Sequence, residues 1–70
     1  MTDDAVARHR RGAHTHEEAA ERHREAARRL EAMGDNERAM LEHRNAEIER
    51  QAAELEHDRA ELEERRAGER

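Results

Sequence analysis

The stretch RLEAMGDNERAMLEHRNAEI, residues 29–48, decides how this chain folds. Apolar residues recur every seven positions through it, which is the spacing of helices that pack along a common seam. Gly34, Asp35 and Asn36 interrupt the stretch with residue types that end one helix and cap the next. The stretch therefore predicts a helical hairpin that turns at residues 34–36, with one continuous helical rod as the alternative.

The composition favours long, solvated helices over a globular core. The 70 residues are 47% charged and 33% hydrophobic and include no aromatic residue, which leaves little apolar material for a core. Proline is absent and glycine is rare, while the strong helix formers Ala, Glu and Arg make up most of the chain. No apolar run is long enough for a signal peptide or a membrane span. We therefore expect an all-α, cytoplasmic protein that forms one domain over residues 1–70.

Capping signals predict where the helices begin and end. Thr2 and the two aspartates after it can cap a first helix, and Gly12 can stop it, so the segment 1–12 is expected to hold a short, fraying helix. Thr15 and Glu18 have the spacing of a capping box, which predicts that a second helix starts just after Thr15. Nothing interrupts the chain between the central turn and Ala67. The expected helices span residues 3–11, 16–33 and 36–67.

A seven-residue repeat runs along the chain and changes character at the central glycine. The first half carries the small residues Val6, Ala13, Ala20 and Ala27. The second half carries the large aliphatic residues Leu41, Ile48, Leu55 and Leu62. Because large and small side chains interdigitate well, we expect the aliphatic row to pack onto the alanine face of the first half.

A hairpin centred on the turn also predicts a register. Facing residues should have numbers that add up to about 71, which sets Leu30 beside Leu41 and places three histidines, His9, His16 and His23, beside the aliphatic row. A domain-swapped pair of rods would make the same contacts between two chains. The expected helix-packing residues are Ala20, His23, Ala27, Leu30, Met33, Leu41, Ile48, Leu55 and Leu62.

A second alanine row follows the turn and allows two interpretations. Its members are Ala39, Ala46, Ala53, Ala60 and Ala67. They repeat on the face of the last helix that lies opposite the aliphatic row. We interpret them as good helix formers at solvated positions, and a second contact face is the alternative.

The run AMGDNERAM resembles the helix-turn-helix joints of tetratricopeptide-type repeats, in which Ala, then Gly-Asp, then Ala recur at similar spacing. The resemblance covers residues 19–46. It lacks the aromatic residues of those repeats, and no second copy of the unit is present. The resemblance therefore supports a turn at this place and implies no particular function.

The small number of large apolar residues favours self-association. A single hairpin would bury too few of them to offset the entropy lost on ordering the chain. A second hairpin would cover the apolar surface that the first leaves open. We therefore expect a homodimer, arranged as a four-helix bundle or a coiled coil.

The residue types argue against catalysis. The chain has no Cys, Ser, Lys or Tyr, and therefore few groups that could act as a nucleophile, so neither an enzyme nor a cofactor is expected. We expect a non-enzymatic helical assembly or protein-protein interaction module with a protein partner of unknown identity. One alternative is a small DNA-associated regulator that uses the basic end from Arg8 to Arg11. Another is a histidine-mediated metal or pH-responsive oligomer.

The charge and histidine patterns weigh against these two alternatives. The net charge is −5, and residues 21–38 interleave arginines with acidic residues, so nucleic acid is not expected as a partner. His14, His16 and Glu17 cluster, and Glu54 and His57 have a metal-ligand spacing, but such a site needs inward-facing carboxylates from several helices, and Glu54 and His57 lie off the aliphatic row. The pairs His43–Glu47 and His57–Glu61 are explained more simply as solvated ion pairs. Burial of the first-half histidines beside aliphatic residues would favour their neutral form.

Overall fold

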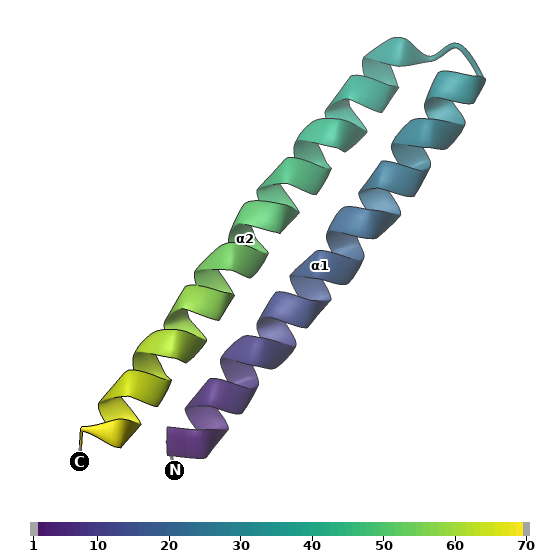
Figure 1. Cartoon of the computed structure of the whole chain (residues 1–70). Coiled ribbons are helices and arrows are strands. Elements are labelled where there is room, and N and C mark those ends of the chain that lie inside the picture. Colours follow the sequence, from purple (N-terminus) through teal and green to yellow (C-terminus); the bar gives the residue numbers. More distant parts are fainter. Residues whose placement is uncertain (1, 70) are drawn as a thin grey trace.

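The protein is a helical hairpin of two long helices. The computed structural model describes residues 2–69, with side chains from residue 4 onward. Helix α1 spans Thr2–Ala32 and helix α2 spans Asn36–Gly68. They lie side by side and antiparallel along their whole length, so both chain ends lie opposite the turn (Figure 1). The hairpin prediction is thus confirmed, and the continuous rod is wrong.

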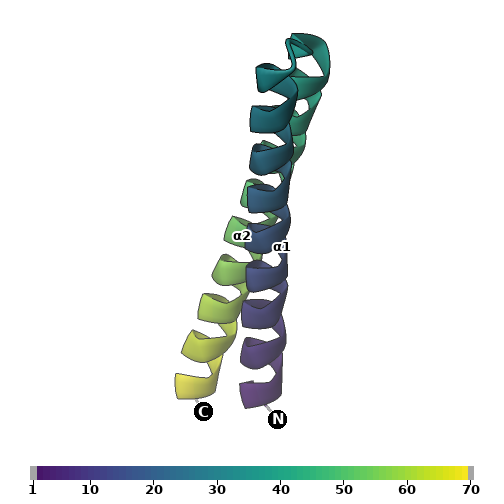
Figure 2. The same cartoon turned by 90° about the vertical axis from the view of Figure 1, so that its right-hand side faces the viewer.

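The hairpin is narrow and slightly twisted. Its Cα atoms extend over 56 × 13 × 9 Å. Seen from the side, α2 passes from one side of α1 to the other along its length (Figure 2). A seven-residue repeat is slightly shorter than two turns of a straight α-helix, so helices that keep such a repeat in contact must wind around each other. Within residues 2–69, neither helix is apolar enough to cross a membrane.

The turn between the helices is held by backbone geometry and one cap. Gly34 takes a left-handed conformation with a φ of 81°, which residues with a Cβ rarely adopt. The Asp35 N–H donates to the Leu30 carbonyl at 2.9 Å. The Asp35 side chain accepts from the Arg38 N–H at 3.2 Å and caps the start of α2. The reversal is therefore complete within three residues.

The predicted break near residue 12 does not exist, and α1 is one helix. The short helix over residues 3–11 and the separate helix over residues 16–33 are therefore wrong. The Thr15 hydroxyl donates to the Arg11 carbonyl at 3.0 Å, inside the helix, and does not cap a new one. The cap expected from Thr2 and Asp3 concerns side chains outside the described part of the chain.

Gly12 serves the packing of the two helices and does not end α1. A Cβ at this position would lie 3.3 Å from Oε2 of Glu56, which reaches across from α2. Glycine inside a helix costs about 1 kcal/mol relative to alanine. Here the missing side chain leaves room for a carboxylate between the helices, and the flanking residues carry the helix through.

The core of the hairpin consists of small residues from both helices. The buried residues are Val6, Ala13, Ala20, Ala27, Ala39, Ala46, Ala53 and Ala60. Each row repeats every seven residues, so a single stripe of each helix faces the other. The interpretation of the second alanine row as solvated is therefore wrong, and within the hairpin it is the contact face.

The predicted packing of large aliphatic residues onto α1 is also wrong. Residues Leu41, Ile48, Leu55 and Leu62 lie on the outer surface of α2. On one flank of the core the cross-helix hydrogen bonds pair residues whose numbers add up to 65, as in His23 with Glu42, and on the other flank they add up to 74, as in Glu17 with His57. These sums lie on either side of the predicted value of about 71, so the error lies in which face of α2 meets α1. Leu30 accordingly does not face Leu41, and Met33 is exposed.

The two alanine rows form the contact between α1 and α2 because their small side chains let the helix backbones approach closely. Close approach brings the residues beside the core within hydrogen-bonding distance across the interface. The predicted contact face of α2 would instead have set imidazoles against aliphatic side chains and left the glutamates beside the alanine row without these partners. Polar pairing and small-residue packing thus select the same arrangement.

We expect Ala46→Leu to destabilise the hairpin by about 1–3 kcal/mol, because a leucine would force apart two helices whose contact is filled by alanine. Ala32→Leu is the matched control, since Ala32 is exposed at the end of α1. Urea unfolding followed by far-UV circular dichroism, at one protein concentration, measures both variants. A stable Ala46→Leu variant would contradict close alanine packing.

Candidate functional site

A row of large exposed aliphatic side chains runs along α2, here called the leucine row: Leu41, Ile48, Leu55 and Leu62. Their exposed fractions are 56%, 62%, 48% and 36% in that order. Each lies two positions after a core alanine, or about 200° around the helix, so the row faces away from α1. The hairpin buries α2 on one side and leaves an apolar stripe on the other.

Methionines extend the apolar surface near the turn. Met40 is 63% exposed and Met33 is 71% exposed. Met40 precedes the first member of the leucine row and lies about 100° away from it around the helix. The two methionines thus add exposed apolar side chains next to the row at the closed end of the hairpin.

Beside the core, three histidines of α1 pair with three glutamates of α2; we call this set the histidine ladder. The Nδ1–H groups of the histidines donate to the Oε2 atoms of the glutamates. The distances are 2.6 Å for His9 to Glu56, 2.5 Å for His16 to Glu49 and 2.6 Å for His23 to Glu42. The three histidines are spaced by seven residues along α1, and the three glutamates by seven residues along α2. The same histidine–glutamate pair therefore recurs along one flank of the hairpin.

The opposite flank carries further cross-helix pairs, whose members are spaced by multiples of seven residues. His57 Nε2 lies 2.7 Å from Glu17 Oε1, and His43 Nε2 lies 3.3 Å from Glu31 Oε1. At the open end Arg10 pairs with Glu64. The alanine core therefore lies between two lines of polar contacts, and these contacts favour the register in which small residues meet small residues.

Glu56 is the most strongly held member of the ladder. Its side chain is 16% exposed and accepts from His9 and from Arg59, the latter at 2.5 Å. The hydrogen bond from His9 and then that from Arg59 lower the pKa of Glu56 below its ordinary value of 4.5. The space that accepts this carboxylate is the one left by the missing side chain of Gly12.

The outer surface of the helices holds ion pairs within one helix. Arg50 pairs with Glu47 at 2.6 Å and with Glu54 at 2.8 Å. The bonds to Glu47 and Glu54 raise the pKa of Arg50, and the bond from Arg50 lowers the pKa of Glu47. Such exposed pairs contribute little to stability. They place a strongly polar strip beside one edge of the leucine row.

The histidines do not occupy the places that the sequence predicted. His9, His16 and His23 contact glutamates and not aliphatic residues, and their side chains are 27%, 38% and 34% exposed. The expected row of imidazoles buried against leucines is therefore wrong. His14 pairs with Glu18 of its own helix at 3.1 Å.

The metal-binding alternative gains no geometric support. The residues described, 2–69, contain no group of three or more His, Asp or Glu side chains that could hold a metal ion. His57, one candidate ligand, is engaged with Glu17 and lies away from the ladder. The seven-residue spacing places successive ladder pairs about 10 Å apart, which is too far for them to share an ion.

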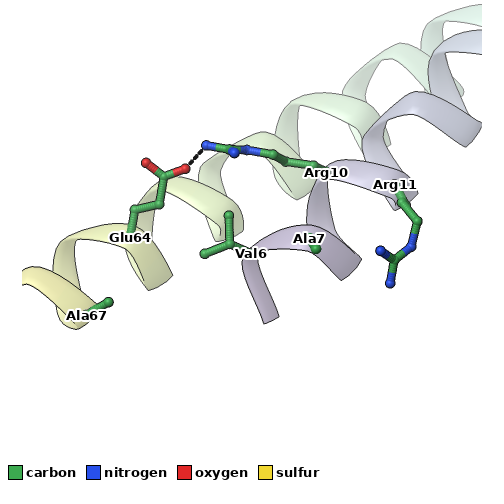
Figure 3. Close-up of a pocket in the computed structure, with 6 residues that line it drawn as sticks. All are labelled: Val6, Ala7, Arg10, Arg11, Glu64 and Ala67. Carbon is green, nitrogen blue, oxygen red and sulfur yellow. Dashed lines mark ion pairs between the residues drawn. The ribbon is translucent and has the colours of Figure 1, made fainter. Parts of the chain in front are cut away.

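A pocket of about 750 Å³ lies at the open end of the hairpin, where the two helices separate. Val6 points between the helices, while Arg10 reaches across to Glu64 and Arg11 points away from it (Figure 3). The basic end that begins at Arg8 is therefore partly neutralised by an acidic residue of α2. This geometry does not form a cradle for a phosphate group.

The sequence contains a signal for the ladder: a seven-residue spacing that is shared by residues of the two helices and is not apparent from any residue taken alone. Glu42, Glu49 and Glu56 recur every seven residues on α2, and the three ladder histidines recur every seven residues on α1. A row of histidines and a row of glutamates that share the same seven-residue spacing can pair along an entire antiparallel contact. This match would have identified the alanine row of α2 as the contact face.

Comparisons with protein-family models, with curated proteins and with solved structures found no match for this chain. Two features of the chain itself bear on its function: the leucine row, which is exposed, and the histidine ladder, which joins the helices.

We expect Glu56→Gln to reduce the loss of stability of the hairpin in acid. Because the pKa of Glu56 is lowered in the folded state, its contribution is full above 4.5 and is lost as the pH falls through the lowered folded value. The variant lacks this contribution at neutral pH and has nothing to lose in acid.

Melting temperatures measured between about pH 7 and pH 2 test this expectation. Glu61→Gln is the control, since Glu61 is exposed on the outer surface of α2. The wild type and the control should lose stability in parallel, while the melting temperature of Glu56→Gln changes less. Identical slopes for all three proteins would contradict the role assigned to the Glu56 carboxylate.

Proposed function

We propose that this chain is a non-enzymatic helical assembly module that associates with a second copy of itself through the leucine row. The single observation that carries the proposal is the exposure of four large aliphatic side chains in one line on α2. The alanine core already joins the two helices of one chain, so the row has no role in holding the hairpin together. Exposed apolar side chains that line up along one helix face mark an interaction surface.

The regular spacing of the row supports a helix as its partner. Leu41, Ile48, Leu55 and Leu62 recur every seven residues, which matches the seam of one helix packed along another. A globular pocket or a small ligand would not need four equally spaced contacts over three heptads. A second helix with the same period meets all four.

A second copy is the simplest partner that supplies such a helix. Each copy presents the same row, so a two-fold arrangement buries eight aliphatic side chains and leaves no row uncovered. Burial of a side chain such as leucine contributes about 1.5–3 kcal/mol when it starts fully exposed, and these begin roughly half-buried. Association also costs translational and rotational freedom, so we expect a dimer of micromolar affinity.

The proposed dimer differs from the compact four-helix bundle expected from the sequence. A face-to-face bundle would bury the histidine ladder, because the ladder runs along the groove between α1 and α2. Burial of such charged and polar groups carries a desolvation cost that the few alanines beside them would not offset. Association along α2 leaves the ladder in contact with water.

We expect Leu55→Glu to shift the protein from dimer to monomer without unfolding the hairpin. Leu55 is 48% exposed and faces away from α1, so a charge there opposes association but leaves the alanine core unchanged. Light scattering with refractive-index detection suits this chain, which lacks Trp and Tyr. Ala32→Glu is the matched control, because Ala32 is exposed at the end of α1 and does not belong to the apolar surface of α2.

The wild type and Ala32→Glu should show about twice the chain mass at high micromolar concentration, and Leu55→Glu the mass of one chain. Circular dichroism should show equal helicity for all three. A wild type that stays monomeric up to about 1 mM would overturn the proposal. Binding to duplex DNA that weakens steeply with salt would favour the regulator that uses the Arg8 to Arg11 end.

A further inference from the structure

We infer that the two copies pack antiparallel, α2 against α2, about a two-fold axis beside Gln51. The inference rests on the proposed function above and names the arrangement of the partner. It sets Leu41 of one copy opposite Leu62 of the other, and Ile48 opposite Leu55. All four members of each leucine row are then in contact, and the assembly is closed.

The hairpin itself supplies the rule for which flanking residues meet. Across its antiparallel core, the residue three positions after a core alanine of α1 contacts the residue three positions after a core alanine of α2. His23 follows Ala20 by three, Glu42 follows Ala39 by three, and His23 pairs with Glu42 at 2.6 Å. We apply the same rule to an antiparallel contact between two leucine rows, which also repeat every seven residues.

Applied to the leucine row, this rule brings opposite charges together. The residues three positions after the row members are Arg44, Gln51, Asp58 and Arg65. In the proposed register Arg44 meets Asp58 of the second copy, and Gln51 meets its own counterpart. Arg65 meets Glu37 of the second copy. The two-fold axis repeats each contact, so four pairs of opposite charge flank the eight aliphatic side chains.

The other flank of the row contains no opposing like charges. The residues four positions after the row members include Asn45, Ala52, Arg59 and Arg66. On its second flank the hairpin pairs residues that lie four positions after core alanines, as in Glu17 with His57. The same pairing places Arg66 beside Asn45 of the second copy, and Arg59 beside Ala52 of the second copy. One flank of the contact is therefore complementary in charge. On the other flank each arginine meets an uncharged residue, so no like charges repel each other.

The residues that would form these new pairs are exposed and are not used within the hairpin. Arg44, Asp58, Arg65 and Glu37 all lie on the surface of α2. None of them takes part in the ion pairs found among residues 2–69, although most neighbouring charges do, as Arg50 does with Glu47 and Glu54. Their charges are thus available to a second copy.

Other arrangements of the same two helices do not give this complementarity. A parallel, in-register pair would set Arg44 against Arg44 and Asp58 against Asp58. An antiparallel pair shifted by seven residues one way would set Arg44 against Arg65, and the other way would set Asp58 against Glu37. Like charges held opposite each other weaken association. Charge therefore selects one orientation and one register.

Charge reversal tests the pairing of Arg44 with Asp58. Arg44→Asp turns two attractions into two repulsions, so its dimer dissociation constant should rise roughly tenfold at low salt, and Asp58→Arg should do the same. The double variant Arg44→Asp/Asp58→Arg should regain an affinity close to that of the wild type. An equimolar mixture of the two single variants should form a heterodimer more tightly than either forms a homodimer.

Distances between spin labels test the orientation independently. Because the chain has no cysteine, Gln51→Cys and Met40→Cys each carry one label per copy. The antiparallel dimer puts the labels at position 51 next to each other and those at position 40 about 35 Å apart along the helix axis. A parallel dimer would give a short distance at both positions.

The outcomes separate this inference from the proposed function. A wild type that remains monomeric overturns the proposed function, and the arrangement with it. A wild-type dimer with two short label distances, or with single reversals that leave the dissociation constant unchanged, leaves self-association in place and overturns the antiparallel arrangement. Restored affinity in the double variant together with a long distance at position 40 supports it.

Discussion

The close approach of two alanine rows is the constraint on which the rest of this hairpin depends. Side chains no larger than a methyl group bring the helix backbones near enough for the flanking residues to reach across the contact. Histidine and glutamate can then pair directly, and Gly12 gives the carboxylate of Glu56 the space it needs. A larger core would bury more apolar surface, but it would separate these polar pairs.

Much of the fold could be predicted from the sequence, and the reason lies in the central turn. Gly34, Asp35 and Asn36 combine a left-handed position with a helix cap, and few residue types do either well. The helix end predicted at Gly12 was wrong, because this glycine lies inside α1 and leaves space for the Glu56 side chain. A single glycine does not reveal in sequence whether it ends a helix or makes room for a neighbour.

The contact face was harder to predict because hydrophobicity favoured the wrong stripe. Leu41, Ile48 and their equivalents form the most apolar line of α2, and one expects such a line to be buried within a chain. The structure instead buries Ala39 and its equivalents, and the deciding signal is the matched period of the histidines and glutamates beside them. The leucine row then lies on the outer surface of α2. A row of this kind has the same sequence pattern whether it packs inside the chain or against a partner.

The repetition of the ladder leaves one flank of the hairpin with a degenerate alignment. A slide of one helix by seven residues would again bring alanine onto alanine and would pair His9 with Glu63, His16 with Glu56 and His23 with Glu49. The ladder and the alanine core thus specify the alignment only to within a multiple of seven residues, while on the other flank the same slide would set Glu17 against Glu64. The short turn at Gly34 acts together with that flank, because a long slide would need a longer connection between the helices. A turn of three residues at one end thus helps to select the alignment of two helices that together extend over 56 Å.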